Sequence, residues 1–153
     1  MAAHTWQHIL TTESQPGLLD DQIRDLATDA KGRVWIATAG GLNRFEPEGA
    51  RCESYPVSAG LAGADIINLS VRDEELWYVT SKGGLGCFDG MDWTVLAPES
   101  GWRGLRSEDV AMAVPDSDSQ NAWFVGRGGQ VAKYELAERR WTLFPDLPDS
   151  EVV

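Results

Sequence analysis

The sequence predicts an all-β protein built from repeated four-stranded antiparallel units, and three observations support this prediction. A series of sequence marks recurs at nearly constant spacing along the 153-residue chain. The 16 glycines and 7 tryptophans are typical of short strands that are joined by glycine turns and that pack large aromatic rings between layers. No segment has the apolar periodicity of an amphipathic helix, so we expect strands throughout.

The repeat begins with a leucine that is followed five positions later by Ile or Val. These pairs are Leu18/Ile23, Leu61/Ile66, Leu105/Val110 and Leu147/Val152, and the leucines are 43, 44 and 42 residues apart. A triplet centred on tryptophan, a Gly-Gly pair and a closing aromatic residue follow in three units. The tryptophans are Trp35, Trp77 and Trp123, the glycine pairs begin at Gly40, Gly83 and Gly128, and the aromatics are Phe45, Phe88 and Tyr134. The constant order and spacing indicate a structural repeat.

Four antiparallel strands are expected in the first unit. β-branched and aromatic residues alternate there with turn signals rich in glycine. The expected strands are 23–28, 33–38, 42–45 and 51–56, and the expected turns are 29–32, 39–41 and 46–49.

Units of four strands at this period are typical of β-propeller blades. We therefore expect an all-β β-propeller fragment in which three four-stranded antiparallel blades and a flanking strand form an open arc. The expected blades are 18–57, 61–97 and 105–145, preceded by an outer strand at 4–11 and followed by the start of a further blade at 147–153. A truncated larger propeller explains both flanking pieces, whereas closure by association of three-blade copies would leave them surplus.

The three repeat tryptophans are expected at equivalent positions on second strands, where each ring fills the gap between adjacent blades. Only the middle blade has neighbours from this chain on both sides. We therefore expect the loss of Trp77 to cost more stability than the loss of Trp35 or Trp123.

The segments 17–23 and 32–45 resemble the two-component-regulator propeller repeat, in which an apolar strand, a Gly-x-apolar-Trp mark and a Gly-Gly-Leu-x-x-aromatic mark follow one another. The second unit departs from the pattern at 73–75 and carries an extra residue, Lys82. The third unit has a longer turn at 116–121 and Gly126 in place of a threonine. Propellers of this family often form sensor domains of hybrid histidine kinases, so the resemblance implies a module that recognises a ligand or a partner.

Charge and composition exclude several classes of protein. The chain has 13 Lys and Arg residues against 24 Asp and Glu residues, a net charge of −11, which argues against nucleic acid and anionic membranes as partners. It contains no apolar run long enough to span a bilayer. Cys52 and Cys87 are too few for a disulfide framework, and residues 1–10 lack the features of a secretory signal. We expect a cytoplasmic protein, with a periplasmic location as the alternative if the chain is part of a membrane sensor.

The expected binding surface is the mouth of the central channel, where the loops before the first strands and the middle hairpins converge. The candidate binding residues there are Asp21, Asp65, Asp109, Lys82 and Arg127. A plainer alternative is that the aspartates satisfy backbone N–H groups at strand entry. No catalytic residue, metal site or cofactor is predicted.

The sequence therefore predicts a non-enzymatic β-propeller module for binding or sensing, part of a larger propeller or signalling protein. It should associate through exposed blade flanks or belong to a longer chain. The alternative is a propeller enzyme of the streptogramin-lyase type whose catalytic residues lie outside this segment. The two histidines, His4 and His8, lie on the expected outer strand, away from the channel axis, which disfavours that alternative.

Overall fold

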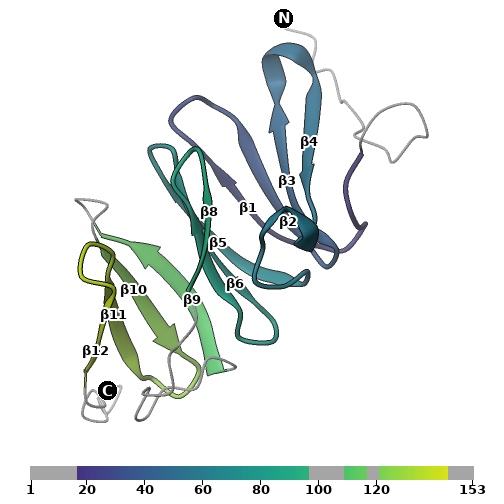
Figure 1. Ribbon diagram of the computed structural model, residues 1–153. Helices are drawn as coiled ribbons and strands as arrows, with labels where there is room; N and C mark the ends of the chain where they lie inside the picture. Colours follow the sequence, from purple (N-terminus) through teal and green to yellow (C-terminus); the bar gives the residue numbers. More distant parts are fainter. Residues whose placement is uncertain (1–16, 97–108, 117–120, 145–153) are drawn as a thin grey trace, which may run out of the picture.

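The computed structural model describes residues 17–96, 109–116 and 121–144 (Figure 1). These residues form three antiparallel four-stranded sheets, which we call blades 1, 2 and 3, and strand order in each sheet follows chain order. Blade 1 contains β1 (Ile23–Thr28), β2 (Val34–Thr38), β3 (Gly41–Glu46) and β4 (Arg51–Tyr55), with 3-10 turns η1 (Pro47–Gly49) and η2 (Val57–Ala59). Blade 2 contains β5 (Ile66–Arg72), β6 (Glu75–Thr80), β7 (Leu85–Phe88) and β8 (Trp93–Leu96). Blade 3 contains β9 (Val110–Pro115), β10 (Asn121–Gly126), β11 (Val131–Glu135) and β12 (Arg140–Phe144).

The blades lie side by side in an open arc with blade 2 in the middle, and their first strands β1, β5 and β9 are neighbours (Figure 1). The predicted fold class, an all-β β-propeller fragment with three blades in an open arc, is confirmed. In blade 1 the strands begin and end within one residue of the expected positions. The flanking strand expected at 4–11 and the further blade expected at 147–153 lie outside the described residues.

Glycine is required where blade 1 turns back between β2 and β3. Gly41 adopts a φ of 143°, and a Cβ atom there would lie 2.6 Å from the Leu19 side chain and 2.7 Å from the Tyr55 carbonyl. Any larger residue would push apart the chain segments that meet at this corner. The Gly-Gly mark of the repeat is therefore a steric requirement of the hairpin.

The hydrophobic core consists of two layers, one on each side of blade 2. The first layer joins blades 1 and 2 and includes Trp35, Leu42, Leu69, Leu76, Tyr78 and Phe88. The second joins blades 2 and 3 and includes Trp77, Val79, Leu85, Val110, Phe124 and Tyr134. Successive residues of a strand point to opposite faces of the sheet. Neighbouring residues such as Trp77 and Tyr78 therefore belong to different layers.

The repeat tryptophans occupy equivalent register positions but have different surroundings. The Trp35 ring lies 5.7 Å from both Tyr55 and Phe88, and its indole N–H donates to the Asp29 carboxylate at 3.1 Å. The Trp77 ring lies 6.1 Å from Phe124, and its buried indole N–H finds no acceptor among the described residues.

The difference arises in the turn between the first two strands of each blade. The register places Arg72 of blade 2 where blade 1 has Asp29. Blade 2 makes a shorter turn, with Asp73 at a φ of 53°, so no carboxylate reaches Trp77. In blade 3 the aspartate is present again, because the Trp123 indole nitrogen lies 3.4 Å from the Asp116 carboxylate.

A hydrogen bond also joins the first strands of neighbouring blades. β1 and β5 each contain an irregularity after their first residue, and Asp25 and Asn68 lie just past it. The Leu69 N–H donates to Asp25 at 2.8 Å, and the Ala113 N–H donates to Asn68 at 3.0 Å. Blades 1 and 2 therefore each supply an acceptor to a backbone N–H of the next blade.

The expectation that the loss of the whole Trp77 side chain costs most stays a prediction, and the indole N–H contacts give a separate one. We predict that Trp35→Phe lowers the free energy of unfolding more than Trp77→Phe, although both remove the same volume. The first change deprives the buried Asp29 carboxylate of a donor, whereas the second removes an N–H that has no acceptor. The expected difference is about 1–3 kcal/mol, measured by urea denaturation. An equal or larger loss for Trp77→Phe would contradict this explanation.

Candidate binding site at the channel mouth

The residues just before the first strands and just after the second strands are joined in the same way in all three blades. The N–H groups of Ala39, Ser81 and Arg127 donate to the backbone carbonyls of Gln22, Asp65 and Asp109 at 3.1, 2.8 and 2.9 Å. These bonds hold each loop that precedes a blade against that blade's middle hairpin. Each loop that precedes a first strand therefore meets the middle hairpin of its own blade.

Two of the five candidate residues line a single pocket, and the other three lie apart from it. Asp65 and Lys82 both belong to the pocket at the end of blade 2. Asp109 and Arg127 are joined to each other in blade 3 through their main chains. Asp21 is exposed and lies one residue before the position equivalent to Asp65, which Gln22 occupies.

The aspartates do not use their carboxylates for these backbone contacts. Asp65 and Asp109 accept through their main-chain carbonyls, while the Asp65 carboxylate pairs with the Arg24 guanidinium at 3.0 Å. At the entry to β1, the carboxylate that accepts a backbone N–H is that of Asp20, which accepts from Gln22 at 2.8 Å. At this strand entry the capping role considered for Asp21 therefore belongs to Asp20.

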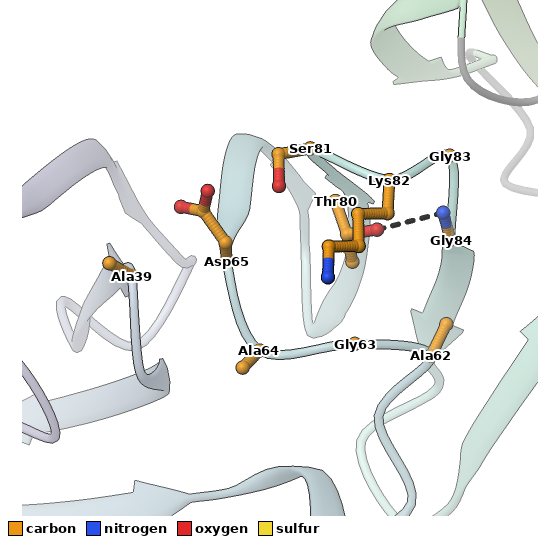
Figure 2. Close-up of a pocket in the computed structure, with 10 residues that line it drawn as sticks. All are labelled: Ala39, Ala62, Gly63, Ala64, Asp65, Thr80, Ser81, Lys82, Gly83 and Gly84. Atoms are coloured by element: carbon orange, nitrogen blue, oxygen red, sulfur yellow. Dashed lines mark hydrogen bonds between the residues drawn. The ribbon is translucent and has the colours of Figure 1, made fainter.

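The pocket has a volume of about 570 Å³ and walls of mostly small residues (Figure 2). It is lined by Ala39, Ala62, Gly63, Ala64, Asp65, Thr80, Ser81, Lys82, Gly83 and Gly84. The chain passes closely at its wall, because a Cβ atom on Gly84 would lie 2.7 Å from the Thr80 hydroxyl and 2.8 Å from the Ala62 carbonyl. The Thr80 hydroxyl accepts the Gly84 N–H at 2.7 Å and fixes the hairpin.

Lys82 supplies the available charge of this pocket. Figure 2 shows its side chain extending between the hairpin and the 62–65 segment. Among the described residues the Lys82 ammonium group has no carboxylate partner within ion-pair distance. Asp65, in contrast, is already paired with Arg24. The unbalanced charge in the pocket is therefore positive, in a protein whose overall charge is strongly negative.

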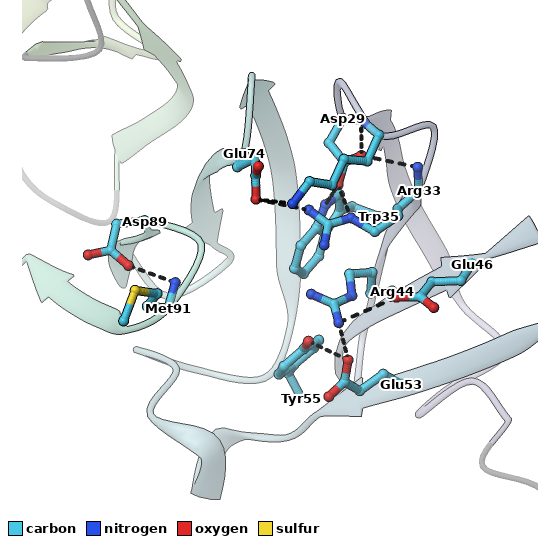
Figure 3. A network of polar contacts seen from close by, with 11 residues as sticks. Asp29, Arg33, Trp35, Arg44, Glu46, Glu53, Tyr55, Glu74, Asp89 and Met91 are labelled. Carbon is cyan, nitrogen blue, oxygen red and sulfur yellow. Dashed lines mark hydrogen bonds and ion pairs between the residues drawn. The ribbon is translucent and has the colours of Figure 1, made fainter.

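A second hollow on blade 1, of about 480 Å³, also contains charged residues. There the charges neutralise one another. Arg44 pairs with Glu53 and Glu46 (Figure 3), and Arg51 also pairs with Glu46. The Arg44 guanidinium also lies 5.5 Å from the Trp35 ring. These contacts brace the sheet and leave no unpaired charge of this group for a ligand.

Asp29 is the centre of a further polar network (Figure 3). This network lies at the end of blade 1 that is opposite the blade 2 pocket. The Asp29 carboxylate accepts from the Lys31 and Arg33 N–H groups, the Arg33 guanidinium and the Trp35 indole. Burial alone would raise the pKa of Asp29, but these hydrogen bonds outweigh it and lower the pKa below its ordinary value. A carboxylate with so many donors is held as a structural anion.

Neither cysteine is an activated nucleophile. Burial raises the pKa of the Cys87 thiol to about 12, and it also raises the pKa of Cys52. Burial likewise raises the pKa of Tyr78 to about 12, and its hydroxyl accepts the Ala62 N–H at 2.8 Å.

Within the described residues no group of His, Cys, Asp and Glu side chains is arranged to hold a metal ion. No helix in the described part of the chain is long and apolar enough to cross a bilayer.

Three antiparallel blades arranged around neighbouring first strands define a segment of a β-propeller. Residues 17–40 match the family model described as two component regulator propeller, and the resemblance expected from the sequence is confirmed. No curated protein gives a significant match.

Solved structures support the same fold. One is described as the extracellular domain of a hybrid two component system, BT3049, from B. thetaiotaomicron (22% identity, TM-score 0.64, 86% of this chain and 18% of that chain). Another is described as the extracellular domain of a one component system, BT4673, from the same organism (20%, 0.61, 88% and 20%). YCF48 from Cyanidioschyzon merolae is a third (15%, 0.62, 80% and 36%).

The chain spans about a fifth of the length of the first two structures. Sequence identities at this level show that the fold is shared. They do not show a shared function, which must be argued from the site. The two bacterial neighbours are extracellular domains, so they give no support to the expected cytoplasmic location.

The Asp29 network makes stability depend on pH. The lowered pKa means that the stabilisation by Asp29 is complete above the ordinary carboxyl value of about 3.9 and is lost as the pH falls through the lower value of the folded state. We predict that Asp29→Asn lowers the free energy of unfolding at pH 7 and flattens its decline below pH ~4. Denaturation at a series of pH values measures both effects. Glu48→Gln, on the exposed η1 turn, serves as the control, and an Asp29→Asn profile parallel to the wild-type profile would contradict the assignment.

Proposed function

We propose that this chain is a non-enzymatic binding or sensory segment of a β-propeller and that it recognises an anionic group of a small ligand or peptide in the blade 2 pocket. The observation that carries this proposal is Lys82, a lysine without a carboxylate partner among the described residues, in a hollow with small walls. A carboxylate is the simplest group that satisfies it.

The pocket suits such a ligand in size and in its polar groups. Its volume of about 570 Å³ falls in the usual range for small-molecule sites. Ser81 offers a hydroxyl beside Lys82, and Asp65 lies across from them in Figure 2. A ligand with a carboxylate at one end and a hydrogen-bond donor at the other would match this order of charges. Because Lys82 is exposed, we expect weak and salt-sensitive binding.

The structural neighbours are compatible with this reading. Two of them are extracellular domains of regulatory systems, and another solved structure is YCF48 bound to D1 peptide. By analogy, we propose recognition of a solute or a peptide end, and a periplasmic rather than a cytoplasmic location. No observation in the described part of the chain favours the enzyme of the streptogramin-lyase type.

NMR titration with N-acetyl-alanyl-alanine and its C-terminal amide tests the proposal. We predict that the free acid shifts the amide resonances of Gly63, Ser81 and Gly84 and that the amide derivative does so at least tenfold more weakly. Loss of one charge-assisted hydrogen bond, about 1.5–3 kcal/mol, corresponds to tenfold or more in affinity. Lys82→Ala should weaken binding of the acid to the level of the amide.

Lys31→Ala is the matched control, because Lys31 is a surface lysine paired with Glu74, in the turn that follows β1. It should leave the titration unchanged. Equal binding of acid and amide, or equal effects of the two lysine variants, would overturn the assignment of Lys82. Shifts that are confined to other blades would overturn the choice of pocket.

A further inference from the structure

The outer face of blade 3, which we call the blade 3 flank, presents apolar side chains to solvent. Met112 and Val114 of β9, Val125 of β10 and Phe144 of β12 are 46%, 40%, 37% and 38% exposed. Register places Val125 opposite Met112, and Trp123 opposite Val114. These residues therefore form one continuous surface across the sheet.

The flank repeats the construction of the face by which blade 1 contacts blade 2. In blade 1 the Trp35 ring lies 5.7 Å from Tyr55 and 5.5 Å from the Arg44 guanidinium. At the equivalent positions of blade 3, the Trp123 ring lies 5.4 Å from Phe144 and 5.8 Å from the Lys133 ammonium.

A neighbouring blade covers this arrangement in blade 1. Phe88 and Trp93 of blade 2 lie 5.7 and 6.4 Å from Trp35. The blade 3 flank thus has the form of a blade-binding face.

One residue of the blade 3 flank differs from its equivalents in blades 1 and 2. This difference indicates which blade can pack on the flank. Register places Met112 where blades 1 and 2 have Asp25 and Asn68, the acceptors for a backbone N–H of the next blade. Methionine is a poor acceptor. A blade that packs on the flank must therefore have a first-strand N–H group that already has an acceptor of its own at this point.

Blade 1 meets this requirement. Its equivalent N–H group, that of Leu26, already donates to the side chain of its own neighbour Asp25 at 2.9 Å. The Leu26 side chain is 59% exposed and is the natural apolar partner for Met112. In blades 2 and 3 the corresponding N–H groups depend on the preceding blade.

We propose that the blade 3 flank binds blade 1 of a second copy of this chain, with Met112 of one copy against Leu26 of the other. The contact is head-to-tail, so it uses a different surface on each copy. The proposal is independent of the ligand pocket.

Analytical ultracentrifugation of the full 153-residue chain tests this association. The wild-type chain should associate reversibly into species heavier than the 16.8 kDa monomer. Leu26→Asp and Met112→Asp, both at exposed positions, should each weaken association at least tenfold, while circular dichroism shows an unchanged fold. Met91→Asp, at a turn residue that is 84% exposed, is the control and should associate as the wild type does.

A mixture of the two variants tests directly whether Leu26 of one copy contacts Met112 of the other. The mixture contains one unaltered pair of surfaces, Leu26 from one variant and Met112 from the other, so it should associate more strongly than either variant alone. A wild-type chain that stays monomeric at high concentration would overturn the proposal. Association that Met112→Asp abolishes and Leu26→Asp leaves intact would also overturn it, because that result indicates flank-to-flank pairing.

Discussion

An isolated four-stranded sheet has two faces, and in these sequences both are apolar enough to need covering. Blade 2 buries Tyr78 against blade 1 and Trp77 against blade 3. The hydrogen bonds from Leu69 to Asp25 and from Ala113 to Asn68 fix the offset between neighbouring first strands. Blade-on-blade packing therefore determines both which residues are large and where the first strands lie.

The candidate site follows from the same packing. In each blade the segment before the first strand meets the middle hairpin, and main-chain hydrogen bonds such as that from Ser81 to Asp65 hold the two together. Glycines and alanines leave a hollow between these segments on blade 2, and Lys82 extends across it. The blades thus position the candidate ligand site on short connecting segments, a common division between scaffold and function.

Repeat spacing was sufficient to predict the three sheets, their order and the equivalence of Trp35, Trp77 and Trp123, because strand register follows directly from a constant period. It could not predict that Trp77 lacks an acceptor, since that depends on a turn in which Arg72 replaces an aspartate. Asp25 and Asn68 were missed, although two polar residues 43 positions apart in apolar strands were a usable signal. The predicted site residue Asp21 lies one residue before the position equivalent to Asp65, which Gln22 occupies. That Asp65 and Lys82 line one pocket could be seen only in the structure.

Residue-resolved amide hydrogen exchange, at a concentration where the chain is monomeric, tests most directly whether contacts between blades stabilise the fold. Exchange of a buried amide reports the free energy of the opening that exposes it. If blade packing dominates, β6 and β7 of blade 2, with both faces covered, should exchange most slowly. Their counterparts β10 and β11 of blade 3 should exchange faster, although their sheet has the same hydrogen bonds. Equal protection in all three blades would show that each sheet is stable by itself and would contradict this account.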